Sequence, residues 1–189
     1  IKQHQVDNQQ KFREKWAAEL SQNHFENSQH LFLARDRSRQ RRCVLVIDHY
    51  VPSYDKDAGS RSTWMYLKLL VELGYNVKFI GANFFPHQPY TNELQQMGIE
   101  VLVGEHFARN IKSWLQDNAD YVHAVYVHRP HVAEQFLSML ERMEPRPKLI
   151  YFGHDLHYLR KERELALTGD NKVAAEGRDW RQREYALFQ

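Results

Sequence analysis

From residue 42 onward, the chain alternates between short apolar runs and longer stretches in which apolar residues recur at three- and four-residue spacing. The short runs are rich in valine, isoleucine and tyrosine, which is typical of buried β-strands. The spaced stretches are typical of helices that bury one face. The predicted strands are Val44–Ile47, Asn76–Ile80, Ile99–Val103, Tyr121–Val127 and Lys148–Phe152.

The first predicted helix runs from about Ser60 to Leu73 and ends at Gly74, because glycine favours the left-handed conformation that closes a helix. The apolar residues that define its predicted buried face are Tyr66, Leu69, Leu70 and Leu73. The other helices are predicted over Thr91–Met97, around Ala108–Asp117, over about His131–Met143 and from Leu156 onward.

Strands that alternate with helices predict an α/β fold with a Rossmann-like, doubly wound parallel sheet of about five strands. Right-handed crossovers give 3-2-1-4-5 as the expected strand order. In such sheets, ligands bind beyond the carboxyl ends of the strands, near the switch point between the first and fourth strands. The candidate functional residues are therefore those that follow residues 47, 80, 127 and 152.

The two ends of the chain differ in composition from this central part. Residues 1–41 contain no glycine or proline, and Phe12, Trp16 and Leu20 lie four residues apart, which predicts a helical linker or extension. Residues 42–165 form the predicted Rossmann-like domain, and residues 166–189 a charged helical segment. The sequence does not begin with methionine, so we expect it to be a piece of a longer polypeptide.

Composition and charge narrow the classes of partner. The 26 basic and 24 acidic residues leave a net charge of +2, which is too mild to predict nucleic acid as a partner. No apolar run approaches the roughly 20 residues that span a bilayer, and the first residues do not resemble a secretion signal. The single cysteine, Cys43, excludes an intrachain disulfide. We therefore expect a cytoplasmic protein with no transmembrane segment.

After the first strand come Asp48 and the turn that holds Asp57, Gly59, Ser60 and Arg61. Gly59 leaves room for a phosphate or sugar near the backbone. The free amides at a helix start bind anions, and Ser60 can cap the helix. The forked cation of Arg61 suits a diphosphate. The turn is neither a P-loop nor a dinucleotide-binding fingerprint, and by itself it fits a simple helix cap equally well.

The fourth and fifth strands also end in polar residues. His128 and Arg129 follow the fourth strand, and His154 and Asp155 follow the fifth. Asp155 or His154 could orient or deprotonate a substrate hydroxyl, whereas Asp155 could also cap the next helix. Because the carboxyl ends of parallel strands share one edge of the sheet, we expect these residues to gather there with those of the first strand.

Metal and hydrolase chemistry are the other classes that this edge suggests. Asp48, His49, His154, Asp155 and His157 are possible ligands. However, no HExxH motif and no CxxC pair is present, and we expect no metal site. A serine hydrolase is also not expected, because the sequence lacks a Gly-x-Ser-x-Gly elbow.

Several of these motifs occur together in one family. The central part of the chain resembles the N-terminal domain of bacterial GT-B glycosyltransferases, and within them the group-1 type whose first loop reads D-x-D-x-G-S-R. The resemblance covers about residues 42–165. It is carried by VLVIDHYVPSYDKDAGSRS, LVELGYNVKFIG, LQQMGIEVL, YVHRPH and KLIYFGHDLHYLRKERE.

The resemblance implies a metal-independent transferase without a cofactor. It would move a sugar from a nucleotide-diphospho-sugar to an acceptor, in the synthesis of a glycan or cell-surface polysaccharide. The implied catalytic residues, which face the acceptor, are His154 and Asp155. The implied substrate-binding residues are Gly59, Ser60 and Arg61 at the donor phosphates and Arg129 and Arg160 along the cleft, together with Asp48 and Asp57 at the same edge.

The sequence departs from a complete enzyme of this type at its end. The glutamate-rich donor signature of a second domain does not follow residue 165, and residues 166–189 are expected to lead towards an absent donor-binding domain. The chain alone is therefore expected to bind a donor poorly and to transfer no sugar. Two alternatives stay open: a non-catalytic nucleotide-binding regulatory module, and a nucleotide-sugar epimerase or hydrolase that uses the His-Asp cluster.

Overall fold

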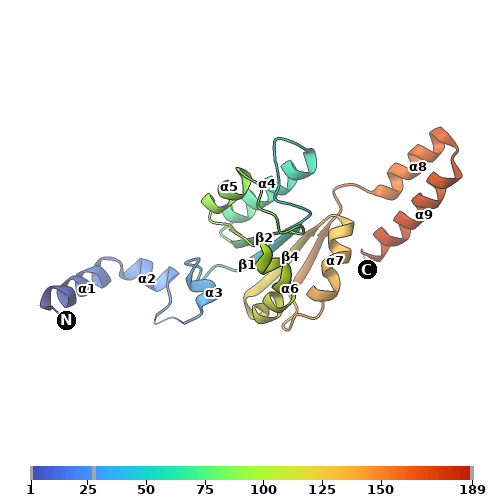
Figure 1. Ribbon diagram of the computed structural model, residues 1–189. Helices are drawn as coiled ribbons and strands as arrows, with labels where there is room; N and C mark the ends of the chain where they lie inside the picture. The colour runs from blue at the N-terminus through green and yellow to red at the C-terminus, as the bar shows by residue number, and fades with distance from the viewer. Residues whose placement is uncertain (1, 27–28, 188–189) are drawn as a thin grey trace.

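The computed structural model describes residues 2–26 and 29–187, and it places a five-stranded sheet between two layers of helices (Figure 1). All strand pairs are parallel, in the order β3-β2-β1-β4-β5. The predicted α/β class and strand order are thus confirmed. The strands are β1 (Cys43–Asp48), β2 (Asn76–Gly81), β3 (Glu100–Val101), β4 (Val122–His128) and β5 (Lys148–Phe152).

Helices α4 (Ala58–Glu72) and α5 (Tyr90–Gln96) cover one face of the sheet (Figure 1). Alternate residues of the central strands point to this face, because successive side chains of a strand lie on opposite sides. Their apolar side chains pack with Leu67 of α4 and Leu94 of α5, both fully buried. The strand residues in this layer include Val44, Val46, Val77 and Phe79.

Helices α6 (Glu105–Asp117) and α7 (Pro130–Leu140) cover the opposite face, and the short 3-10 turn η1 (Ala119–Tyr121) leads into β4. Leu115 of α6 and Phe136 of α7 are fully buried there. The strand residues that they cover include Leu45, Ile47, Ile80, Val125 and Val127. Two apolar layers therefore fix the sheet, and only its edges and strand ends are left for function.

The predicted buried face of the first helix is wrong for two of its four residues, although Tyr66 and Leu70 are partly buried. Leu69 and Leu73 are 47% and 64% exposed, whereas Ser60, Thr63 and Leu67 are buried. The reason is the start of the helix: Asp57 caps its first turn, and Thr63 donates to Asp48 at the end of β1, which turns Thr63 inward and Leu67 inward one turn later. The face is therefore set by the polar contacts at the strand end.

The chain ends form extensions on opposite sides of the sheet (Figure 1). Helices α1 (Gln3–Lys15) and α2 (Ala17–Asn23) bury no residue, and Phe12 and Trp16 stay 55% and 44% exposed. These helices therefore form an extension, and their apolar positions Phe12 and Trp16 are not packed on the sheet. The short α3 (Leu31–Ala34) does contact the body, because Phe32 packs against Tyr121 with ring centroids 4.9 Å apart.

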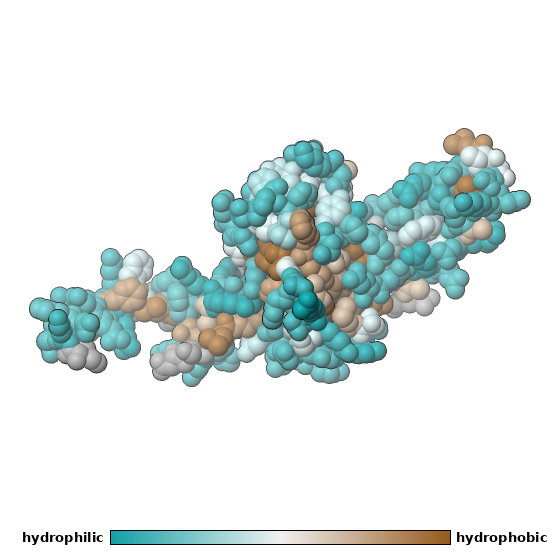
Figure 2. Space-filling model, in the orientation of Figure 1, coloured by the Kyte–Doolittle hydropathy of each residue, from teal (hydrophilic) through white to brown (hydrophobic). Residues whose placement is uncertain are grey.

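At the other end, α8 (His157–Thr168) and α9 (Asn171–Ala186) form an antiparallel hairpin with a mainly hydrophilic surface (Figures 1 and 2). The boundary predicted at residue 165 falls inside α8. Arg183 of α9 donates to both oxygens of Glu134 on α7, with each distance 2.7 Å, and so ties the hairpin to the body. Within residues 2–26 and 29–187, no helix is long and apolar enough to cross a membrane.

Candidate functional site

Asp48 lies at the carboxyl end of β1 and is the centre of the polar cluster. It is 1% exposed, and each carboxylate oxygen accepts a hydrogen bond. Oδ1 accepts from Arg129 Nε and from the amide of His49, both at 2.7 Å, and Oδ2 accepts from Thr63 Oγ1 at 2.6 Å. A buried carboxylate requires such partners. Asp48 therefore links three segments: the loop after β1 through His49, helix α4 through Thr63, and the start of α7 through Arg129.

Arg129 joins β4 to α7 in an unusual backbone conformation, with a φ of 67°. Asp48 holds its Nε, and the ring of Tyr50 lies 5.8 Å from its guanidinium carbon. Its Nη2 atom is buried, and no acceptor for it is found among the described residues. A Cβ atom on Gly59 would lie only 2.8 Å from Nη2, so the absence of a side chain at Gly59 lets the guanidinium approach.

The turn before α4 is a helix cap. Asp57 Oδ1 accepts from the amide of Ser60 at 2.8 Å, and Oδ2 accepts from Ser60 Oγ at 2.6 Å and from Tyr50 at 3.0 Å. Partial burial acts to raise the pKa of Asp57, but the hydrogen bonds from Ser60 and Tyr50 outweigh it and leave the pKa lowered. The amide of Ser60 is thus occupied. The first two helical amides, of Ala58 and Gly59, have no acceptor within a helix.

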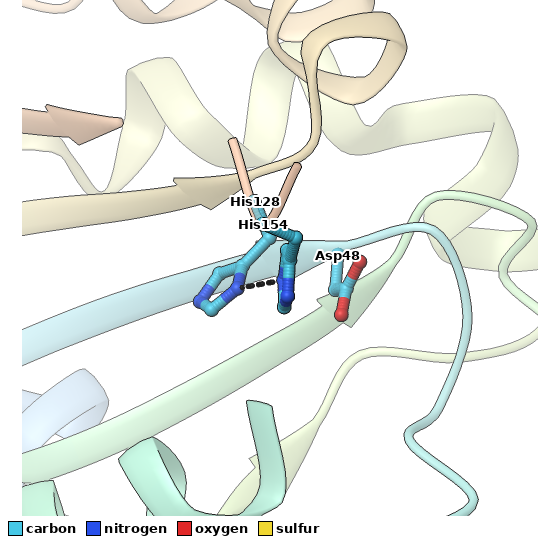
Figure 3. A group of neighbouring side chains, drawn as sticks. All are labelled: Asp48, His128 and His154. Carbon is cyan, nitrogen blue, oxygen red and sulfur yellow. Dashed lines mark hydrogen bonds between the residues drawn. The ribbon is translucent and has the colours of Figure 1, made fainter. Parts of the chain in front are cut away.

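Two histidines adjoin this cluster. His128 ends β4, is fully buried, and places its Nδ1 atom 2.8 Å from Nε2 of His154 (Figure 3). Burial lowers the pKa of His128 to about 4 and also lowers the pKa of His154. Both rings are therefore neutral near pH 7. One ring donates the shared proton and the other accepts it, and Thr63 Oγ1 lies 3.4 Å from the same His128 nitrogen.

Asp155 lies apart from the histidines. Its side chain is 52% exposed and pairs with Arg160 at 3.3 Å. It does not cap α8, since the cap position is Leu156. Between residues 29 and 187, no hydrogen bond joins Asp155 to His154, so the sequence neighbours do not form a catalytic pair in this structure. They share a hollow of about 510 Å³ lined by Gly153, His154, Asp155, Leu156, Leu159, Arg160 and Arg163.

The predicted residues are thus distributed over one rim with two hollows. Arg61 is exposed and lines a second hollow of about 540 Å³ together with Asp57. Asp48, Gly59 and Arg129 line neither hollow; Arg129 contacts Asp48 and the Gly59 position beneath the rim. The structure therefore brings the candidates to one edge, as expected, but pairs them differently from their order in the sequence.

Comparison of the chain with family models, with curated proteins and with solved structures finds no match.

The sequence placed His128 at this edge but gave it no catalytic or binding role, and it did not assign Thr63 or Glu184 to the site. His128 was visible at a strand end, and its place beside β1 follows from the sheet order. Thr63 lies four residues after Gly59, which puts it one helical turn inward. Glu184 is fully buried, and its Oε1 accepts from the amide and the ring of His157, each at 2.8 Å. No local signal predicts that contact across 27 residues.

Proposed function

We propose that this chain is the acceptor-side half of a glycosyltransferase. It would act with a donor-binding domain to move a sugar from a nucleotide-diphospho-sugar to an acceptor such as a glycan. In this proposal Arg129, Arg61 and the first amides of α4 meet the donor diphosphate. The hollow beside His154, Asp155 and Arg160 receives the acceptor, and the loss of a proton from the acceptor hydroxyl is assigned to His154 or Asp155.

The observation that carries this proposal is the state of Arg129. Asp48 fixes one side of its guanidinium, while the buried Nη2 atom has no acceptor among the described residues and points at the bare backbone of Gly59. Buried donors are nearly always hydrogen-bonded. An oxyanion at this place would satisfy Nη2 and would also meet the amides of Ala58 and Gly59 at a helix N-terminus, where negative charge is favoured.

The arrangement of cations supports a diphosphate over a single carboxylate. Arg61 projects from the first turn of α4 into solvent, and no ion pair from its side chain is found in the described part of the chain. In this proposal a second anionic group lies near Arg61, which follows Gly59 by two residues in the first turn of α4. Arginine forks match phosphate oxygens in a bidentate way. One fork at the Gly59 backbone, from Arg129, and a second from Arg61 in the same helical turn as Gly59 would suit a two-phosphate ligand.

The test uses the isolated chain, labelled with ¹⁵N, and a nucleoside diphosphate as the probe. We expect weak binding that shifts the amides of Ala58 and Gly59 and the Nε signal of Arg129. Arg61→Ala should weaken binding roughly fivefold, because an exposed ion pair contributes about 1 kcal/mol. Lys68→Ala is the matched control, since it removes a cation two turns along the same helix face.

Two outcomes of this binding test would contradict the proposal. In the first, the diphosphate shifts no amide at the start of α4. In the second, Arg61→Ala and Lys68→Ala weaken binding equally, which would indicate unspecific charge attraction. Sugar transfer by the 189 residues alone would refute the need for a second half. Donor binding that never leads to transfer, even with a donor-binding domain present, would favour a regulatory nucleotide-binding module.

A further inference from the structure

Three side chains from separate strand ends bring metal-ligand atoms together at the rim. One carboxylate oxygen of Asp48 and one ring nitrogen each of His128 and His154 all lie within 4.8 Å of one another (Figure 3). Asp48 ends β1, His128 ends β4, and His154 follows β5. The cluster therefore depends on the assembled sheet, and no short sequence motif could have announced it.

The chemistry of the three donors selects the ion. Two imidazole nitrogens and one carboxylate oxygen suit zinc and its neighbours among the divalent transition metals, whereas magnesium prefers oxygen ligands alone. Three protein ligands with an open fourth position are typical of zinc sites that bind a further molecule. His154 lines the hollow that also contains Asp155 and Arg160, whereas Asp48 and His128 are buried behind it, so a ligand could approach the ion from the His154 side.

The distances between the three ligand atoms are close to those found around a bound zinc ion. A tetrahedral zinc ion with bonds of ~2.0–2.1 Å holds its ligand atoms ~3.3 Å apart. The two imidazole nitrogens are 2.8 Å apart and need to separate slightly, and the carboxylate needs to approach by at most about 1.5 Å, given the 4.8 Å limit. The proton that the two rings share moves to the other nitrogen of the same ring, so neutral histidines bind without net loss of a proton.

The surroundings of Asp48 resemble the outer shell of a metal site. Metal-binding carboxylates are usually held by further hydrogen bonds, which fix their orientation. Here Thr63 Oγ1 and the amide of His49 hold the two oxygens of Asp48. Arg129 acts in the opposite direction, since its positive charge lies on the same carboxylate at 2.7 Å and repels a cation.

We propose that Asp48, His128 and His154 bind one zinc ion. The site goes beyond the proposed transferase function, which the family resemblance makes metal-independent, and it does not rest on that function. A zinc ion here would place a Lewis acid at the wall of the hollow, where it could hold an oxygen or nitrogen atom of a small ligand.

The experiment titrates the chelator-treated 189-residue chain with Zn²⁺, and separately with Co²⁺, whose visible absorption reports four-coordinate nitrogen and oxygen ligation. We expect one ion per chain. His154→Ala removes a ligand that is only partly buried, so the fold should persist, as circular dichroism would verify. It should weaken zinc binding more than the ~10–100-fold that loss of an outer-shell partner causes, and Thr63→Val should fall within that ~10–100-fold range.

His131→Ala is the matched control, because His131 also forms a histidine pair at this rim, with Nε2 at 2.9 Å from Nδ1 of His49. Zinc binding that is unchanged in His154→Ala, or lost in His131→Ala, would overturn the proposal. Arg129→Gln separates the two proposals, because it should strengthen zinc binding roughly tenfold or more by removing a repelling charge but should weaken diphosphate binding. Diphosphate titrations in chelator test the transferase proposal alone.

Discussion

Substitution of Asp48 by asparagine changes one atom of a buried carboxylate and removes its charge. Asparagine can still accept hydrogen bonds from Arg129 Nε and the His49 amide, and its new amide group can donate to Thr63 Oγ1. The shape of the site is therefore retained. The main loss is the charge that balances the Arg129 guanidinium, whose side chain is only 22% exposed.

The magnitude follows from the three hydrogen bonds. A bond to a charged group stabilises by roughly 1 kcal/mol more than a neutral one, which gives about 3 kcal/mol for three bonds. Breaking one side of a buried ion pair costs about 3–5 kcal/mol in general, and the partial exposure of Arg129 reduces this. In a chain of this size, about 3 kcal/mol lowers Tm by roughly 6–12 °C. We expect Asp48→Asn to fold with that loss.

Urea denaturation at pH 7 measures the free energy of unfolding, with Asp57→Asn as the control. The control makes the same chemical change at the same rim, but Asp57 is more exposed than Asp48 and forms no ion pair with Arg129 among the described residues. Asparagine also caps helices as well as aspartate does, so the cost of the control should be clearly smaller than that of Asp48→Asn. The double variant with Arg129→Gln should recover part of the loss, because no unpaired guanidinium is left. Equal stabilities of Asp48→Asn and Asp57→Asn would refute the view that Asp48 holds Arg129 by charge.

Two further predictions concern the acceptor side and the hairpin. In a protein that joins this chain to its donor-binding half, Asp155→Asn should reduce kcat by roughly 10²-fold, since a positioned acid or base contributes about that factor. The Tm should not change, because Asp155 is exposed. Unchanged turnover would leave Asp155 with only its Arg160 contact. The pKa of Glu134 is lowered by its hydrogen bonds from Arg183, so its stabilising contribution is complete above its unfolded pKa and is lost as the pH falls from about 4.5 through the folded pKa. In wild type, the α9 amides should therefore be less protected from hydrogen exchange below that pH than at pH 7. In Glu134→Gln, the protection of α9 should not change between the two pH values.

The strands and their order follow from the sequence because each apolar run is short, bounded by polar residues and separated by a helix of sufficient length. The last strand, Lys148–Phe152, has the predicted bounds, whereas the third shortens to Glu100–Val101 at the sheet edge, where only one neighbour fixes its length. The buried face of α4 was predicted only in part, for a different reason. Periodicity counted its leucines, but the contact of Thr63 with Asp48 set the rotation of the helix.

The candidate site, too, could be predicted only in part. Parallel pairing of β1 with β4, which sets Ile47 beside Val127, makes Asp48 and His128 neighbours once the strand order is known. The sequence could therefore predict which residues share the rim. It could not predict their pairing, because this depends on two residues at positive φ, Arg129 and His154, whose side chains bond Asp48 and His128 at the neighbouring strand ends. Neither is a glycine, and such conformations are uncommon for other residues.

These two turned residues make Asp48 the point at which the two proposals meet. On one side it fixes Arg129, whose free nitrogen favours an anion; on the other it adjoins two neutral imidazoles, which favour a cation. The single negative charge of Asp48 would then be shared between the Arg129 guanidinium and the bound metal ion. A bound zinc ion would draw on Asp48 and loosen its hold on Arg129, whereas a bound diphosphate would draw Arg129 away and leave Asp48 freer to bind metal. Zinc affinity measured with saturating nucleoside diphosphate should therefore exceed that of the free chain, and equal affinities would show that the two groups at this rim act independently.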